Sequence, residues 1–302
     1  MPASISRYDL LRFRLDRFTR ALHGVETGEL RALRRARVAS RRLRELIPVL
    51  QLGAALTRKL ARRLRRVRRR LGTVRELDVL LLVIQELEKS GGYPQVALAR
   101  IAGEIRDARR AAWPKQAGKR AAVELKQVAR SLGRVARKLE PGDAARQPGR
   151  TWRWVIDARV ARRASHLKAV IEEAGAMYSP RRLHTVRIAL KKLRYSVELA
   201  ADASGRPAKA DLQALKRGQD VLGRMHDLQV LIDRVRRLQA SLLPPDLTEG
   251  RDLDTLLISL ESTCRRLHAR YIRDWATLVA ICQRSAQKAA AGSRPTPVRR
   301  AG

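Results

Sequence analysis

The chain has 302 residues, and its 66 Lys and Arg against 29 Asp and Glu give a formal net charge of +37. Hydrophobic residues make up 45% of the chain, enough for folded cores, so the charge imbalance favours a folded protein with a polyanionic partner. No apolar run approaches the roughly 20 residues of a membrane span, and the basic N-terminal segment lacks the apolar stretch of a signal peptide. We therefore expect neither a membrane-spanning nor a secreted protein.

Cys264 and Cys282 are the two cysteines of the chain, and they show no metal-ligand spacing and no disulfide framework. Such sparse cysteine usage is typical of a reducing compartment. We therefore expect a cytoplasmic protein. The length is compatible with one large domain or with two of about 150 residues.

Apolar residues recur at helical spacing in the first half, and strand-like alternation is almost absent, which predicts an all-α fold. Gly24 to Gly28, Gly53 and the Gly91-Gly92-x-Pro94 turn separate the expected helices, and Gly72 is expected to bend or interrupt the chain. The last helix of this half is either continuous or broken near Trp113-Pro114. The expected helices cover about residues 4–23, 29–50, 54–71, 74–90 and 95–139.

Residues 141–150, PGDAARQPGR, form the best linker in the sequence because two Pro-Gly pairs leave little room for regular structure. A second half then follows the same plan, and each half is expected to be an antiparallel helical bundle. The expected helices cover about residues 151–174, 180–203, 209–222, 225–242 and 253–290. We divide the chain into a first half at 1–142, a linker at 143–150, a second half at 151–290 and a disordered basic tail at 291–302.

Segment 181–199 carries its cations in an unusual place for an amphipathic helix. On a helical wheel of about 100° per residue, a basic stripe lies between two apolar edges instead of opposite a single one. The wheel puts Lys191 in this stripe and its neighbour Lys192 at the solvent edge. Cations between apolar edges repel one another and resist desolvation, so the arrangement needs a compensating anion or a wet cavity. The stripe consists of His184, Arg187, Lys191 and Arg194.

The same pattern occurs 150 residues earlier, with Arg41 in the stripe and Arg42 at the solvent edge. A second pair of similar blocks, 67–80 and 218–231, follows at an offset of 151 (218 − 67). Two blocks in the same order at nearly one spacing indicate a tandem duplication that builds two pseudo-symmetric halves. The first-half counterparts of the stripe are Arg34, Arg37, Arg41 and Arg44.

These motifs resemble the two repeat signatures of CHAD domains, the conserved histidine α-helical domains, over about residues 4–290. The second-repeat signature reads His184-x-x-Arg187-x-x-x-Lys191-Lys192-Leu193-Arg194-Tyr195, followed by Leu222-Gly223-x-x-x-Asp227. The first-repeat signature reads Arg37-Val38-x-x-Arg41-Arg42-Leu43-Arg44, followed by Leu71-Gly72-x-x-Arg75-Glu76-x-Asp78-Val79. The resemblance implies two helical bundles around a basic central cavity, and binding of inorganic polyphosphate. Arg34 stands where the family has its first-repeat histidine, and His226 where it usually has a small amide.

Polyphosphate carries charge on every phosphate and offers no base to stack or read, so a protein that binds it needs repeated phosphate ligands. Arginine supplies planar bidentate donors and lysine a compact charge. Helical positions i, i+3, i+7 and i+10 rise about 15 Å in total, so each stripe could contact several phosphates. We expect the third helix of each half to widen this basic trough. The predicted polyphosphate-binding residues are Arg34, Arg37, Arg41, Arg44, Arg65, Arg66, Arg69, Arg75, His184, Arg187, Lys191, Arg194, Lys216, Arg217 and His226.

Several side chains in these motifs have a second interpretation. His184 is as consistent with a buried, hydrogen-bonded histidine as with a phosphate ligand. His226 could pair with Asp227 instead of touching a ligand. Glu198 lies within the basic stripe, so we expect it to pair with Arg194 or with an arginine that faces it.

The sequence contains no Walker loop, no His-Glu-x-x-His and no clustered carboxylates for magnesium, so we expect no catalytic residue, metal or cofactor. We expect a binding module that targets or organises polyphosphate granules. Nucleic acid is the alternative ligand, because a charge of +37 attracts any polyanion at low salt. Against that alternative, aromatic residues make up only 4% of the chain and form no obvious stacking platform.

Overall fold

The computed structural model describes residues 5–139, 150–241 and 247–292, and in these ranges all regular structure is helical. The prediction of an all-α fold is confirmed. None of the helices in the described ranges is long and apolar enough to cross a membrane. The first half contains α1 (Arg7–Arg20), α2 (Leu30–Leu46), the 3-10 helix η1 (Ile47–Leu50), α3 (Ala54–Ser90), α4 (Gln95–Ala112) and α5 (Lys115–Lys138). The second half contains α6 (Arg150–Ala174), α7 (Pro180–Ser204), α8 (Lys209–Gln239) and α9 (Leu247–Gly292).

Local sequence signals set several helix ends. At the start of α1, the Ser6 hydroxyl accepts a hydrogen bond from the Asp9 amide, and the Asp9 carboxylate accepts one from the Ser6 amide. Pro180 occupies the first turn of α7, where its missing N–H costs nothing. Gly205 ends α7 with a φ of 65°, a left-handed conformation that favours glycine.

The expected interruption at Gly72 and the expected boundary at residues 222–225 are wrong, and of the two alternatives for residues 95–139 the broken helix is the one observed. Helix α3 runs through Gly72, and α8 runs through the expected boundary at residues 222–225. A glycine inside a helix costs only about 1 kcal/mol relative to alanine. Leu71 and Val74, which flank Gly72, are fully buried, and burying such side chains offsets that cost. The break near Trp113-Pro114 is real, because Pro114 cannot continue α4 and instead precedes the first turn of α5.

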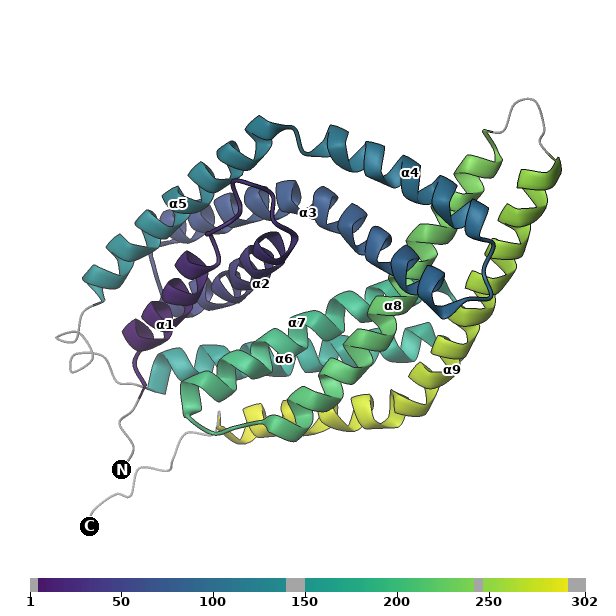
Figure 1. Cartoon of the computed structure of the whole chain (residues 1–302). Helices are drawn as coiled ribbons and strands as arrows, with labels where there is room; N and C mark the ends of the chain where they lie inside the picture. Colours follow the sequence, from purple (N-terminus) through teal and green to yellow (C-terminus); the bar gives the residue numbers. More distant parts are fainter. Residues whose placement is uncertain (1–4, 140–149, 242–246, 293–302) are drawn as a thin grey trace, which may run out of the picture.

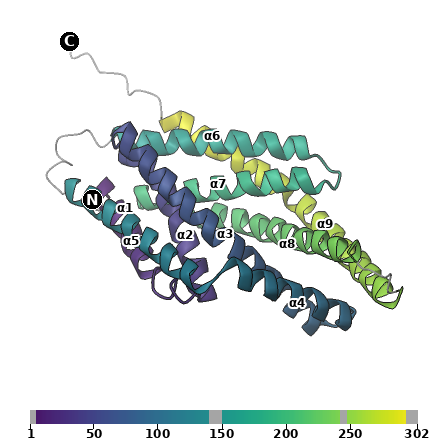
Figure 2. The same ribbon diagram turned by 90° about the horizontal axis from the view of Figure 1, so that it is seen from above.

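Each half contains a four-helix bundle. Helix α1 packs on α2 and α5, and α3 also packs on both of these; in the second half α6 packs on α7 and α9, as does α8. The two bundles lie side by side in Figure 1 and in the view from above in Figure 2. Helix α4 lies outside the first bundle and packs along the C-terminal part of α3 and against α8 and α9.

The hydrophobic core joins the two halves. One buried cluster contains α1, α2, α5, α6 and α7 together with the N-terminal parts of α3 and α8 and the C-terminal part of α9. The other cluster is built from the remaining parts of α3, α8 and α9 and from α4. Of the predicted linker only Arg150 is described, as the first residue of α6, and of the predicted tail only residues 291–292, at the end of α9.

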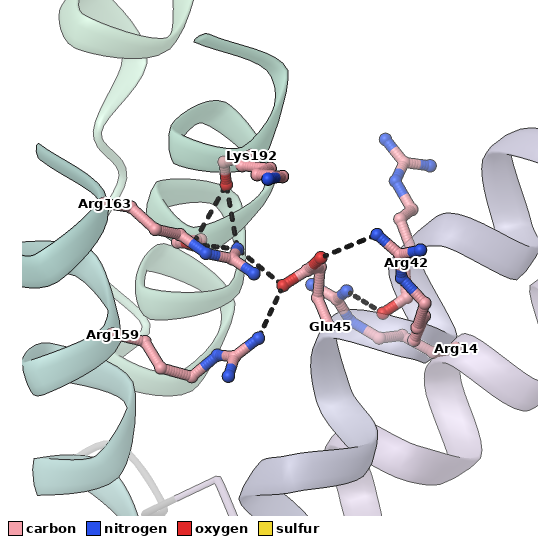
Figure 3. A network of polar contacts seen from close by, with 8 residues as sticks. Arg14, Arg42, Glu45, Arg159, Arg163 and Lys192 are labelled. Atoms are coloured by element: carbon pink, nitrogen blue, oxygen red, sulfur yellow. Dashed lines mark hydrogen bonds and ion pairs between the residues drawn. The ribbon is translucent and has the colours of Figure 1, made fainter. Parts of the chain in front are cut away.

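A buried ion network fixes α2 of the first half against α6 of the second (Figure 3). Glu45 on α2 is only 3% exposed, and Arg163 and Arg159 of α6 approach its carboxylate at 2.5 and 3.0 Å. Burial alone would raise the pKa of the Glu45 carboxyl, but the hydrogen bonds and charges of Arg163 and Arg159 outweigh it and hold that pKa below its usual range. Arg163 also donates to the Lys192 carbonyl at 2.9 Å.

Two further ion pairs connect the first half to α7. Arg42 on α2 contacts Glu198 at 2.5 Å, and buried Arg14 on α1 contacts Asp202 at 2.7 Å. The expectation that Glu198 pairs with a facing arginine is confirmed. The wheel-based expectation that Arg42 lies at the solvent edge is wrong, because α2 is covered by α7 at this position and the Arg42 side chain is mostly buried. These contacts hold α2 and α7, the helices that carry the basic stripes, next to each other.

Candidate anion-binding site

A cavity of about 560 Å³ lies between α2 and α3 of the first half and α7 and α8 of the second. Its lining contains seven basic side chains and three carboxylates, so the surplus charge is strongly positive. The basic side chains are Arg34, Arg37, Arg41, Arg75, Arg187, Lys191 and Arg224. The carboxylates are those of Glu76, Asp220 and Asp227.

The helical periodicity of α2 and α7 orients part of each basic stripe toward this cavity. On α2, Leu33, Ala36 and Leu43 are fully buried in the core, which fixes the rotation of the helix. The positions beside this apolar face, Arg37 and Arg41, therefore project into the space between the halves. Helix α7 is fixed in the same way by its own buried leucines, so Arg187 and Lys191 line the same cavity.

Gly72 of α3 leaves room for Arg37 of α2. A Cβ atom at Gly72 would lie 3.4 Å from Nη1 of Arg37, and the same Nη1 donates a hydrogen bond to the Leu71 carbonyl at 3.3 Å. The glycine thus permits a close approach between α2 and α3. This approach places the Arg37 guanidinium in the cavity wall.

The cavity partly desolvates its cations. Burial, together with the nearby charges of Arg187 and Arg41, lowers the pKa of Lys191 to about 7. Burial and then Arg41 and Arg75 lower the pKa of Arg37 to about 10. A bound anion would attract these cations and so offset the repulsion among them. The site therefore favours an occupant with many negative charges.

Two buried donors in the wall have no hydrogen-bond partner among the described residues: Nη1 of Arg75 and Nε of Arg187. Arg187 has only a long contact of 4.0 Å between its Nη2 and the Asp227 carboxylate. Buried donors are normally paired, and an unpaired one costs about 1–3 kcal/mol. An oxyanion in the cavity would supply the missing acceptors.

His184 and His226 contact each other at one end of the cavity. Their Nδ1 atoms are 3.2 Å apart, so one ring donates and the other accepts. Burial, followed by Arg187 and His184, lowers the pKa of His226 to about 3, and burial also lowers the pKa of His184. His226 reaches the cavity lining, whereas His184 does not. The alternative pairing of His226 with Asp227 is not the one observed, since its ring hydrogen-bonds to His184.

Other predicted site residues lie outside the cavity lining. Arg44 is half-buried next to Glu45, and Arg194 donates to the Gln219 side chain at 2.9 Å while its guanidinium stacks on Tyr195. Arg65 precedes Gly72 by seven residues, which puts it about 10 Å farther along α3. The exposed residues outside the lining are Arg65, Arg66, Arg69, Lys216 and Arg217.

Arg224, Asp220 and Gln219 line the cavity although the sequence did not single them out. Arg224 forms an ion pair with Glu86 of α3 at 2.7 Å, so it also bridges the halves. A usable signal was present: Asp220 and Arg224 are one helical turn apart and flank Leu222-Gly223, the motif already identified. No group of three or more His, Cys, Asp or Glu within the described ranges could hold a metal ion.

In its described ranges the protein is all-helical, with a basic, partly desolvated cavity between two four-helix bundles. A family model described as the CHAD domain matches residues 9–236, and the chain belongs to the CHAD domain family. The crystal structure of the CHAD domain from the plant Ricinus communis is similar, with a TM-score of 0.60 and 19% identity over 91% of this chain and 90% of that one. PptA from Streptomyces chartreusis is similar with a TM-score of 0.55 and 18% identity over 94% and 98%. No curated protein matches the sequence.

Proposed function

We propose that the protein binds inorganic polyphosphate in the cavity between its two halves. The observation that carries the proposal is the lining itself, in which seven cations outnumber three carboxylates and buried donors of Arg75 and Arg187 lack acceptors. A thin chain with a charge on every phosphate fits such a wall, because arginine donors match phosphate oxygens at any position along it. Membership in the CHAD domain family supports the same ligand class.

The proposed role is that of a binding module that targets or organises polyphosphate granules in the cytoplasm, not that of an enzyme. The His184–His226 pair is kept neutral by burial and by neighbouring cations, which suits a hydrogen-bonding role. In this proposal the cavity binds the phosphate chain and performs no reaction on it.

Nucleic acid is the competing ligand because of the net charge of +37. A cavity of about 560 Å³ is too small for a duplex, whose major groove alone is roughly 12 Å wide. Recognition of single strands relies on aromatic side chains that stack with bases. Tyr195, in the lining, is only 6% exposed and is covered by Arg194. The cavity therefore favours a ligand without bases.

Long-chain polyphosphate should displace RNA of equal total charge from the protein at about 0.15 M salt, where the Debye length is about 8 Å. The reason is that exposed surface charges are screened at this ionic strength, whereas the partly buried cations of the cavity are screened much less. Equilibrium competition with a labelled RNA measures the two affinities directly. Retention of the RNA in the presence of excess polyphosphate would favour the nucleic-acid function instead.

The affinity for long-chain polyphosphate should fall as the pH rises above about 7. Lys191 has a pKa of about 7 in the free protein, and a bound polyanion favours its protonated form, so binding takes up a proton above that pH. One coupled proton makes the affinity fall by at most about tenfold per pH unit. Isothermal titration from pH 7 to 9 measures the trend.

Lys191→Met is the control for this pH dependence, because it keeps an apolar stem but cannot take up the proton. The variant should bind more weakly at pH 7 and show a flatter profile between pH 7 and 9. An unchanged slope in the variant would assign the pH dependence to another group. The free wild-type protein should also gain stability from this group between pH 7 and about 10.5, because the unfolded state, with the ordinary lysine pKa, binds more protons in that window.

A further inference from the structure

A second cavity, of about 410 Å³, lies in the first half at the corner where α4 ends and α5 begins. Figure 1 shows this corner next to α3, on the side away from α7. The volume is within the roughly 300–1,000 Å³ that is typical of small-molecule sites. The residues that line it, here named the corner pocket, are Arg70, Thr73, Ala112, Trp113, Pro114, Ala117 and Arg120.

The corner pocket is separate from the cavity between the halves. The two share no lining residue. On a wheel of about 100° per residue, Arg70 and Thr73 lie roughly 100–160° from Gly72, which is in the wall of the larger cavity. Helix α3 therefore presents one face to each of them.

Two glycines hold Trp113 in place at this corner, where Pro114 ends α4. A Cβ atom at Gly28, which has a φ of 74°, would lie 2.6 Å from Nε1 of Trp113, and one at Gly118 would lie 3.4 Å from the same atom. The pyrrole part of the indole thus packs against these two backbones. Trp113 is half-buried and still reaches the lining of the corner pocket, so it offers a pre-positioned aromatic surface.

Two arginines meet on the other side of the corner pocket. Nη1 of Arg70 donates to the Glu124 carboxylate at 2.7 Å, and its remaining guanidinium donors are left for a ligand. Arg120 precedes Glu124 by one helical turn, so it lies close to the point where Arg70 meets α5. The side chain of Arg120 is exposed and forms no ion pair or hydrogen bond with another described residue.

The lining contains these two cations, the exposed hydroxyl of Thr73 and the indole, but no carboxylate. A bare phosphate would leave the indole unused, and a neutral aromatic compound would leave the arginines unused. A ligand that carries both a flat ring and a small anionic group matches the whole lining, because bases stack on aromatic side chains and arginines bind phosphate oxygens.

We propose that the corner pocket binds a nucleoside monophosphate, with the base against Trp113 and the phosphate at Arg70 and Arg120. The Thr73 hydroxyl then serves as a hydrogen-bond partner for the sugar. This second site goes beyond the proposed polyphosphate binding and does not depend on it.

Isothermal titration with AMP, adenosine and ribose 5-phosphate at about 0.15 M salt tests the ligand class. AMP should bind about fivefold or more tightly than ribose 5-phosphate, because stacking of the base adds to the phosphate contact. Adenosine should also bind more weakly than AMP, because it lacks the phosphate. Equal affinities for AMP and ribose 5-phosphate would mean that the protein takes up any phosphate group, and would overturn the proposal.

Arg120→Gln and its neighbour Lys119→Gln form a matched pair of variants. Both side chains are exposed on α5, and Lys119 lies outside the lining. Arg120→Gln should weaken AMP binding about fivefold, and Lys119→Gln should change it little. Trp113→Leu should reduce the affinity for AMP to that for ribose 5-phosphate. Because Trp113 also packs on the core, the Arg120→Gln and Lys119→Gln pair decides the test if Trp113→Leu does not fold.

Lys191→Met separates this site from the cavity between the halves. It should leave AMP binding unchanged, and Arg120→Gln should leave the binding of long-chain polyphosphate nearly unchanged. A loss of AMP binding in Lys191→Met but not in Arg120→Gln would assign AMP to the larger cavity and overturn the corner pocket. Equal losses for Arg120→Gln and Lys119→Gln would also overturn it. Absence of AMP binding to the wild-type protein would overturn the corner pocket alone and leave the proposed polyphosphate binding unaffected.

Discussion

Glu45→Gln is expected to lower the free energy of unfolding by about 2–3 kcal/mol and the melting temperature by several degrees. The substitution removes the only carboxylate that contacts both Arg159 and Arg163 among the described residues, and leaves two mostly buried guanidinium groups with an uncharged amide. Breaking a fully buried pair in this way costs about 3–5 kcal/mol. We expect somewhat less because the two arginines retain some contact with solvent. Thermal and urea unfolding measure the change.

Glu86→Gln is the matched control for Glu45→Gln. Glu86 also pairs with an arginine across the two halves, Arg224 at 2.7 Å, but its side chain is 64% exposed. An exposed pair of this kind contributes at most about 1 kcal/mol. Equal losses in the two variants would show that the network in Figure 3 is not what joins the halves.

The acid limb of the stability curve provides a second readout for Glu45. Its pKa is depressed in the folded state, so its contribution is fully present above the unfolded value of about 4.5 and is lost as the pH falls through the folded value. The wild-type protein should therefore lose stability more steeply below about pH 4.5 than Glu45→Gln does.

The sequence predicted the helices well because apolar periodicity is a local property. Its errors occurred at Gly72, where an interruption was one of the expectations, and at residues 222–225, where a helix boundary was expected. In the folded protein the buried residues around these glycines keep α3 and α8 continuous, and Gly72 makes room for Arg37. Packing between helices decided the outcome, and packing cannot be obtained from a single-helix pattern.

The candidate site was predicted where the pattern lies within one helix. Arg37, Arg41, Arg187 and Lys191 were found because each stripe has apolar residues on both sides, and all four line the cavity. The environments of Arg42 and Arg224 depend on how α2 and α8 meet helices of the other half. That geometry follows from the tertiary structure alone. The helical wheel therefore placed Arg42 wrongly at the solvent edge, and the sequence pattern did not identify Arg224.

Lys191→Met should weaken binding of long-chain polyphosphate about tenfold or more, the loss of a charge-assisted contact of roughly 1.5–3 kcal/mol. Lys191 lines the cavity and is partly desolvated by its surroundings, so its contact with phosphate would be little screened. The substitution should not destabilise the free protein, because it removes a charge that Arg187 and Arg41 repel. Unchanged or higher stability would confirm that the loss of affinity is local.

Lys192→Met supplies the control on the next residue of α7. The Lys192 side chain is exposed and lies outside the cavity lining, and Arg163 contacts only its backbone carbonyl, which the substitution keeps. Its removal should lower the general positive field, with a small effect that fades as salt increases.

The most direct test of the cavity as the binding site is the affinity of long-chain polyphosphate for these two variants and the wild-type protein, at low salt and at about 0.15 M salt. The cavity predicts a loss of about tenfold for Lys191→Met at both salt concentrations, and a much smaller loss for Lys192→Met that disappears at the higher one. Equal losses for the two variants at both concentrations would mean that polyphosphate responds to net charge alone and that the cavity is not its site.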